Sequence, residues 1–129
     1  MASSNKRLNG GGFPNARYEF TQLSWAAAVS SAKTATLSNL NMLVDRIDAL
    51  FSTTTDNVTV TFTLTDQNSV VVATFTALAD ATNHMKLSTT ATPDFPAIPL
   101  ADDTLTLSAT LSAVPGTSGA TLDVILRGP

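Results

Sequence analysis

The sequence predicts an antiparallel β-sandwich of jelly-roll-like topology, preceded by a flexible N-terminal arm. Apolar and polar residues alternate in several segments, turn-forming residues separate those segments, and a long proline-containing segment connects two of them. Strict alternation indicates strands that bury one face and expose the other, as in an antiparallel sheet. The chain of 129 residues has the length of one domain. We therefore expect an arm over residues 1–17 and one sandwich domain over residues 18–129.

The clearest strands lie after residue 56. In residues 57–65 each apolar residue is followed by a threonine, and residues 66–68 (DQN) form a turn signal before a second apolar segment, residues 69–78. These two segments predict a β-hairpin, and residues 102–111 and 121–128 predict two further strands. The apolar residues expected to face the core are Val58, Val60, Phe62, Leu64, Leu105, Leu107, Ala109, Leu111, Leu122, Val124 and Leu126. The polar residues expected to face outward are Thr59, Thr61, Thr63, Thr65, Thr104, Thr106, Ser108 and Thr110.

Residues 79–100 form a long connection that contains Pro93, Pro96 and Pro99. Because proline has no N–H donor, it is excluded from a central position in a sheet. We expect a short strand around residues 84–88, and an ordered loop or an edge strand in the remainder.

Two segments permit both a helix and a strand. In residues 18–37, Tyr18 and Phe20 alternate with polar residues, whereas Trp25, Ala28, Val29 and Ala32 follow helical spacing. In residues 38–53 the apolar residues recur at helical intervals, and Ser38 or Asn39 is available as an N-cap. Periodicity alone favours a short helix over residues 38–53, although a sheet-rich domain can impose a strand on such a segment.

Composition and charge exclude several classes of function. The chain contains no cysteine, which excludes disulfides, thiolate metal sites and cysteine nucleophiles. A net charge of −3 and a pI near 4.7 argue against general binding of nucleic acid, which requires clustered Lys and Arg. No apolar segment is long enough for a membrane-spanning helix, and the N-terminus lacks the apolar core of a secretory signal. We expect a soluble protein that is made in the cytoplasm.

Catalysis has one candidate base, His84, which is the only histidine. Asp80, His84 and Ser88 lie within nine residues of each other, but a catalytic triad is assembled by the fold rather than by local spacing. No nucleophile-elbow pattern surrounds any serine. We therefore expect an exposed loop histidine and no enzymatic activity.

Acidic residues suggest two places for calcium: the turn at residues 66–68, or Asp102 and Asp103 beside Asp80. Neither has the spacing of a twelve-residue EF-hand loop, and Asp and Asn are ordinary turn residues. We expect no metal and no cofactor. Binding of carbohydrate usually requires exposed aromatic residues, and the chain has one Trp and one Tyr, Trp25 and Tyr18.

Thr and Ser make up about a quarter of the chain, against average usage nearer an eighth. In the simpler interpretation, threonine covers the solvent face of an antiparallel sheet. In the functional interpretation, a face of short, uncharged side chains suits packing against neighbouring copies, because its desolvation costs less than that of Lys or Glu.

The arm over residues 1–17 contains three basic residues and no acidic residue, whereas the remainder of the chain is acidic. Such a segment cannot offset its ordering entropy by burying itself. It is either a disordered terminus or an arm that becomes ordered against a partner. In the second case Lys6, Arg7, Phe13 and Arg17 are the candidate contact residues.

Residues 35–129 include the segments NVTVTFTLTDQN, SVVVATFTALAD, DFPAIPLADDTLTLSATLS and GATLDVILRGP. These four segments resemble small head proteins of tailed double-stranded-DNA bacteriophages. The resemblance is to decoration (cement) proteins, and it rests on strand order, Thr–Val alternation and the terminal TLDVILRG. It implies that residues 43–52 form an inner strand.

For function, the resemblance implies a non-enzymatic virion protein on the outside of the capsid. Proteins of this kind often form trimers, bridge neighbouring major capsid subunits and use an N-terminal arm. No binding residue is carried over by motif, so Lys6, Arg7, Phe13 and Arg17 are capsid contacts predicted from composition. The alternative is a neck, tail or head-fibre component, including a β-sandwich module that binds a host glycan.

Overall fold

The computed structural model describes residues 3–7, 17–88 and 93–128, and for residues 3–7 and 17 it describes the backbone alone. These residues form nine strands and no helix. No helix in this part of the chain is therefore long and apolar enough to cross a membrane. The strands are β1 (Ser3–Arg7), β2 (Arg17–Trp25), β3 (Lys33–Val44), β4 (Arg46–Phe51), β5 (Thr59–Asp66), β6 (Val71–Ala79), β7 (Thr82–Leu87), β8 (Ile98–Leu111) and β9 (Ala120–Gly128).

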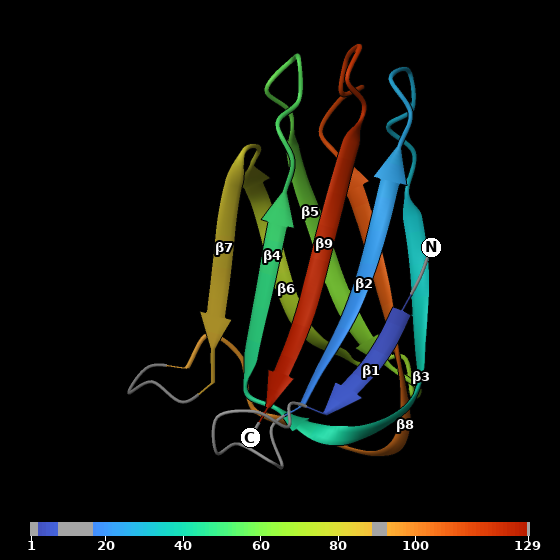
Figure 1. The fold of residues 1–129 in the computed structure, drawn as a ribbon, viewed down its shortest axis with the longest axis vertical. Coiled ribbons are helices and arrows are strands. Elements are labelled where there is room, and N and C mark those ends of the chain that lie inside the picture. Colours follow the sequence, from blue (N-terminus) through green and yellow to red (C-terminus); the bar gives the residue numbers. More distant parts are fainter. Residues whose placement is uncertain (1–2, 8–16, 89–92, 129) are drawn as a thin grey trace.

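The strands form two antiparallel sheets packed face to face (Figure 1). The five-stranded sheet has the order β1-β2-β9-β4-β7, and the four-stranded sheet has the order β3-β8-β5-β6. From β2 onward every connection crosses between the sheets, except the β5–β6 hairpin. Eight strands connected in this way are a jelly roll. The predicted antiparallel sandwich of jelly-roll-like topology is therefore confirmed.

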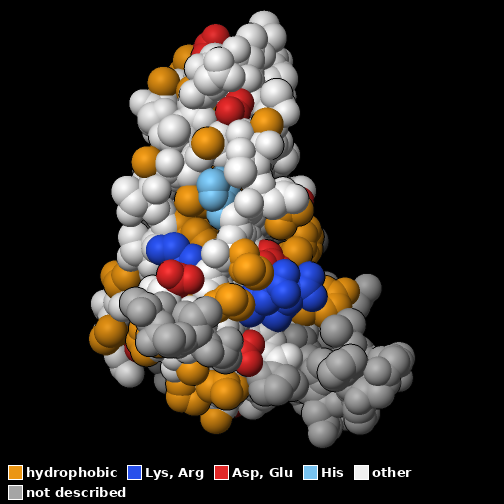
Figure 2. Space-filling view, turned by 90° about the vertical axis from the view of Figure 1, so that its left-hand side faces the viewer, with side chains coloured by type: hydrophobic (Ala, Val, Ile, Leu, Met, Phe, Trp, Pro, Cys, Tyr) orange, Lys and Arg blue, Asp and Glu red, His pale blue; other side chains and the backbone are white. Residues whose placement is uncertain are grey.

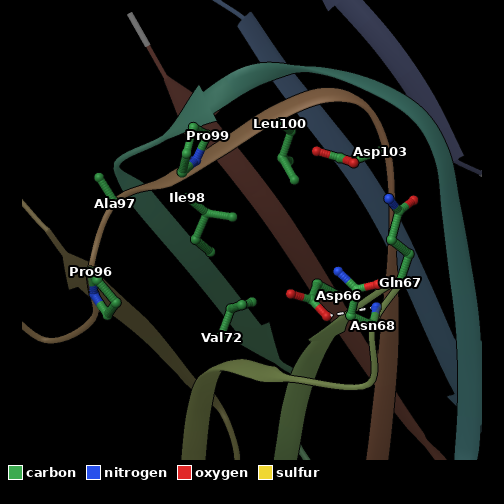
Figure 3. A pocket seen from close by; sticks show the side chains of 10 residues that line it. All are labelled: Asp66, Gln67, Asn68, Val72, Pro96, Ala97, Ile98, Pro99, Leu100 and Asp103. Atoms are coloured by element: carbon green, nitrogen blue, oxygen red, sulfur yellow. Dashed lines mark hydrogen bonds between the residues drawn. The ribbon is translucent and has the colours of Figure 1, made fainter.

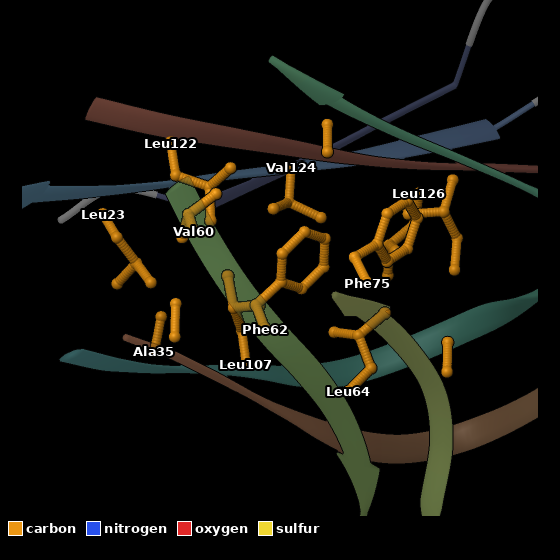
Figure 4. Close-up of a cluster of buried hydrophobic side chains, with 14 of the residues drawn as sticks. Leu23, Ala35, Val60, Phe62, Leu64, Phe75, Leu107, Leu122, Val124 and Leu126 are labelled. Atoms are coloured by element: carbon orange, nitrogen blue, oxygen red, sulfur yellow. The ribbon is translucent and has the colours of Figure 1, made fainter. Parts of the chain in front are cut away.

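The core lies between the two sheets and includes the alternating residues predicted from the sequence (Figure 4). All eleven apolar residues expected to face the core in β5, β8, β9 and at Val58 are buried. The rings of Phe62 and Phe75 stack across the β5–β6 hairpin, with centroids 4.4 Å apart and an interplanar angle of 12°. Burial of such apolar surface contributes about 25 cal/mol per Å² and is the main stabilising contribution in a chain without disulfides.

Of the two alternatives for residues 38–53, the short helix favoured by periodicity is wrong, because β3 and β4 occupy this segment. β4 lies between β9 and β7, as expected for the inner strand over residues 43–52. A bulge at Asn39, which has a φ of 57°, shifts the buried positions of β3 by one residue. The chain then passes from one sheet to the other at Asp45, and the buried positions shift again. These two shifts lengthen some of the spacings between buried residues from two to three, so that the strands imitate helical periodicity. The buried residues concerned are Leu37, Leu40, Val44, Ile47, Ala49 and Phe51.

The helical spacing that begins at Trp25 also does not produce a helix, because residues 26–32 form the connection between β2 and β3. In the long connection, β7 confirms the short strand expected near His84. The expectation of an exposed loop histidine is wrong, because His84 is half-buried within β7. β8 begins at Ile98, earlier than expected, and includes Pro99, which pairs with Leu43 of β3. β5 joins β8 on its other side only from Leu105 onward, so Pro99 lies where β8 has one neighbour. The exclusion of proline from a central position therefore holds.

Part of the predicted N-terminal arm has a described backbone. Residues 3–7 form β1, which pairs antiparallel with β2 at one edge of the five-stranded sheet. Residues 8–16 lie outside the described residues. The flexibility of the arm and its boundary at residue 17 stay predictions.

Candidate interaction surface

The outer face of the four-stranded sheet is covered by Thr and Ser, as predicted. Cross-strand pairing places Thr34, Ser108, Thr63 and Thr74 in one row across all four strands. We call this surface the threonine face, and it comprises Thr34, Thr36, Thr61, Thr63, Thr65, Thr74, Thr106, Ser108 and Thr110. Its composition is typical of a solvated antiparallel sheet.

Part of the outer face of the five-stranded sheet has a different composition, with aromatic, aliphatic and arginine side chains, and it borders a row formed by Gln22, Asp123, Leu50 and Asn83. One cross-strand row contains Phe20, Ile125, Asp48 and Met85, and the adjacent row contains Tyr18, Arg127 and Arg46. We call this surface the mixed face, and it comprises Tyr18, Phe20, Arg46, Asp48, Leu50, Met85, Ile125 and Arg127. Tyr, Phe, Met and Arg are enriched in protein–protein interfaces.

The apolar side chains of the mixed face are partly exposed to solvent. The side chain of Met85 is 51% exposed, and Tyr18, Phe20, Leu50 and Ile125 are half-buried. These residues alternate with core residues of β2, β4 and β9, so they point away from the interior. The five-stranded sheet therefore has apolar side chains on both sides, although charged side chains also lie on its outer side.

An ion-pair cluster lies within the mixed face. Asp48 Oδ1 accepts a hydrogen bond from Arg46 Nε at 2.9 Å, and Asp48 Oδ2 accepts one from Arg127 Nε at 2.8 Å. Asp48 is 8% exposed, whereas both arginine side chains extend toward solvent. The Arg127 guanidinium also lies 6.0 Å from the centroid of the Tyr18 ring.

A pocket of ≈ 290 Å³ lies beside this cluster and reaches the β7 edge of the sandwich. Its lining includes Leu50, Met85 and Ile125, together with Asn83 and His84. Figure 2 shows the β7 edge, where basic side chains lie next to apolar ones below the histidine. The pocket thus combines an apolar wall with an arginine-rich rim.

The three residues considered for catalysis have separate partners in the structure. His84 Nε2 lies 3.3 Å from the carbonyl oxygen of Ala79, and Ser88 Oγ donates to the carbonyl oxygen of Asp45 at 3.1 Å. Asp80 Oδ2 accepts hydrogen bonds from the backbone N–H and the hydroxyl of Thr54, at 2.8 and 2.9 Å. The structure does not bring the three side chains together as a hydrogen-bonded triad.

The acidic residues considered for calcium have structural partners as well. Asp66 Oδ1 accepts the N–H groups of Asn68 and Val70, which stabilises the β5–β6 turn. Asp66 and Asp103 line one pocket of ≈ 230 Å³ (Figure 3), where Asp103 Oδ2 accepts the N–H of Ala101. Asp80 lies at the opposite end of the β5–β6 hairpin, so the grouping of Asp80 with Asp102 and Asp103 is wrong. Within the described residues no group of three or more acidic, His or Cys residues could hold a metal ion.

Of the four predicted capsid contacts, the structure describes the backbone of Lys6, Arg7 and Arg17. In the backbone register Lys6 pairs with Tyr18, and Arg7 pairs with Arg17, so β1 lies beside the mixed face. Phe13 lies outside the described residues. The role of these four residues stays a prediction.

Sequence reasoning missed the mixed face, although one signal was present. Ile125 occupies an outward-facing position of the last strand, where the alternation predicts a hydrophilic residue. Leu50 occupies an equivalent outward position in β4. The proximity of Arg46 and Arg127 could not be predicted from the local sequence, because it depends on the pairing of β4 with β9.

Comparisons with known proteins identify similar folds but no family. No family model matches the chain, and no curated protein matches it. A chain from the infectious bursal disease virus Gx strain is similar over 88% of this chain and 32% of that chain, at 15% identity and a TM-score of 0.38. The VP2 subviral particle of the same virus is similar over 86% of this chain and 32% of that chain, at 12% identity and a TM-score of 0.34. The chain therefore spans about a third of the length of these viral chains.

The carbohydrate-binding module CBM6cm-2 from Cellvibrio mixtus lichenase 5A, solved with cellotriose, is also similar. The similarity covers 99% of this chain and 86% of that chain, at 11% identity and a TM-score of 0.42. Proteins of viral particles and a carbohydrate-binding module are thus among the structures that resemble this β-sandwich. At these identities the likeness concerns the fold alone.

Proposed function

We propose that the chain is a non-enzymatic structural protein of a tailed-phage virion. It binds the outside of the capsid and stabilises the shell by bridging neighbouring major capsid subunits. It acts as a homo-oligomer, with a trimer favoured, and requires no cofactor. It is made in the host cytoplasm and is located on the capsid surface.

The mixed face is the observation that supports this proposal most strongly. It presents half-buried aromatic and aliphatic side chains and two arginines on one side of a sheet, a composition typical of binding surfaces. The threonine face on the opposite side has the composition of a solvated sheet. This asymmetry favours a protein that docks on a partner through one face. The sequence resemblance to phage decoration proteins supplies the partner, a major capsid protein.

The alternative of a glycan-binding module has less support. Trp25 is 3% exposed, and its indole Nε1 donates to the carbonyl oxygen of Ser31 at 2.9 Å, so it cannot act as an aromatic platform. Tyr18 is the other candidate of this kind, and its ring lies near Arg127. Binding on a glycan array that is lost in Tyr18→Ala would support the alternative.

A pair of matched substitutions tests the docking face. Ile125 of the mixed face and Thr63 of the threonine face are both half-buried, outward-facing residues in strands with a neighbour on each side. We expect Ile125→Lys to reduce occupancy on expanded capsids at least about tenfold, because a buried unpaired charge at an interface costs more than 1.4 kcal/mol. Thr63→Lys should leave occupancy within about twofold of the unchanged chain. Occupancy is measured by co-sedimentation, and circular dichroism verifies the fold of both variants.

The opposite ranking of the two variants would contradict the docking face, and no attachment of the unchanged chain to capsids would contradict the function itself. Deletion of residues 1–17 tests the arm separately. If the deletion variant is folded but its occupancy on capsids is lower, the arm contributes to attachment. If its occupancy is unchanged, the arm has no part in attachment.

A further inference from the structure

Arg46 and Arg127 are direct cross-strand neighbours in the pairing of β4 with β9. Two like charges in this arrangement repel each other and destabilise the sheet. Asp48 lies two residues after Arg46 on the same face of β4 and contacts both guanidinium groups through their Nε atoms. We call these three residues the arginine clamp.

The arginine clamp retains unused hydrogen-bonding capacity. A guanidinium group has five N–H donors, and in each arginine only Nε–H donates to a described group. The side chains of Arg46 and Arg127 are 45% and 39% exposed, whereas that of Asp48 is 11% exposed. The formal net charge of the three side chains is +1, and the Nη groups of the two partly exposed arginines donate to no described group.

Asp48 also fixes the position of the donors. The two short hydrogen bonds to Asp48 hold both arginine side chains on the sheet, which lowers the conformational entropy that a ligand must remove on binding. Planar Nη groups held in this way match the two oxygens of a carboxylate. A second carboxylate, supplied from outside, is thus the group that the clamp is arranged to bind.

The pocket next to the arginine clamp favours some carboxylate ligands over others. The adjoining pocket of ≈ 290 Å³ has an apolar wall of Leu50, Met85 and Ile125, and Asn83 and His84 complete its lining beside the clamp. A small free anion would not cover the apolar wall, which would stay in contact with water. An acidic sugar would place its hydroxyl groups against the wall, where they lose hydrogen bonds to water. A carboxylate on an aliphatic stem, next to an apolar side chain, satisfies both the clamp and the wall.

We propose that the arginine clamp binds a Glu or Asp side chain of the protein that docks on the mixed face. This inference rests on the proposed function in that the docking protein is the major capsid protein. Binding itself is a property of the isolated chain and can be measured without capsids.

Two short peptides serve as probes: N-acetyl-Leu-Glu-Leu-amide and its matched control with Gln in place of Glu. We expect the Glu peptide to shift the Nε–H resonances of Arg46 and Arg127 in ¹⁵N-labelled protein at low ionic strength. The Gln peptide should bind at least about tenfold more weakly, because it cannot form a charge-assisted bidentate pair. Equal affinity for the two peptides would overturn the proposal.

Substitutions in the clamp complete the test. Arg127→Lys keeps the ion pair with Asp48 but lacks the planar fork, and we expect it to weaken binding of the Glu peptide about tenfold. Lys33→Gln removes a positive charge from β3, outside the mixed face, and should bind as the unchanged chain does. Unchanged affinity in Arg127→Lys, or tighter binding of galacturonate than of the Glu peptide, would contradict the proposal.

The capsid assay separates the two proposals. Attachment that is reduced by Ile125→Lys but not by Arg127→Lys supports the docking face and overturns the clamp. Binding of the Glu peptide by a chain that attaches to no capsid supports the clamp as a carboxylate site and overturns the proposed function.

Discussion

The pH dependence of stability provides a sharp test of the core structure, because the only glutamate of the chain is buried. Glu19 faces inward from β2, is 3% exposed, and its Oε2 has no hydrogen-bond partner among the residues that the structure describes. Burial raises the pKa of Glu19 from 4.5 to about 7, because desolvation disfavours the charged carboxylate. Substitution by glutamine retains the shape of the protonated side chain and removes its ionisation.

The sign of the effect follows from the raised pKa. Below pH 4.5 the carboxyl group is protonated in both the folded and the unfolded chain and does not change the free energy of unfolding. Between pH 4.5 and about 7 the unfolded chain releases the proton and the folded chain retains it, so stability decreases as pH rises. Above pH 7 the loss is complete and amounts to at most about 3 kcal/mol.

We therefore expect Glu19→Gln to match the unchanged chain within about 1 kcal/mol at pH 4 and to exceed it by up to about 3 kcal/mol at pH 8. Urea unfolding followed by tryptophan fluorescence at pH 4, 5, 6, 7 and 8 measures the difference between the two chains. Asp56→Asn, at an exposed position, is the matched control for loss of a carboxylate. A difference in the free energy of unfolding between Glu19→Gln and the unchanged chain that stays constant from pH 4 to pH 8 would show that burial does not raise the pKa of Glu19.

Further predictions concern packing, backbone conformation and a buried hydrogen bond. Phe75→Ala removes a fully buried ring that stacks on Phe62, and should lower the free energy of unfolding by about 3–5 kcal/mol in urea titrations. Gly119→Ala should lower it by about 1–3 kcal/mol in thermal unfolding, because φ is +65° and an added Cβ would lie 2.6 Å from the carbonyl oxygen of Trp25. Thr54→Val removes the hydroxyl that donates to Asp80 and accepts the N–H of Val58, and should cost about 1–3 kcal/mol, with faster hydrogen exchange at Val58. A loss below 0.5 kcal/mol in any of these variants would contradict the contact on which its prediction rests.

The strands with strict alternation were predictable because their pattern is local. Val58 to Thr65 shows the buried and outward positions of β5 directly in the sequence, and the structure has the same pattern. Residues 38–53 were not predictable in this way, because a bulge at Asn39 and a change of sheet at Asp45 shift the buried positions. Local periodicity cannot distinguish two such shifts from one helix.

The candidate site was less predictable than the fold. Arg46 and Arg127 are far apart in the sequence, and their meeting depends on the register of β4 with β9. Pairing between distant strands is fixed by the packing of the whole sandwich and has no local signal. Ile125, an apolar residue at a position where the alternation predicts a polar one, was a local indication that the outer face of this sheet is not entirely polar.

The proposed function requires that the chain lies on the capsid and docks through the mixed face. A cryo-electron microscopy reconstruction of the virion would show the position, copy number and orientation of the chain together. We expect copies on the outer shell in near-stoichiometric ratio to the major capsid protein, with Ile125 and Met85 at the contact. A handful of copies at the neck or tail, or copies that contact the shell through the threonine face, would contradict it.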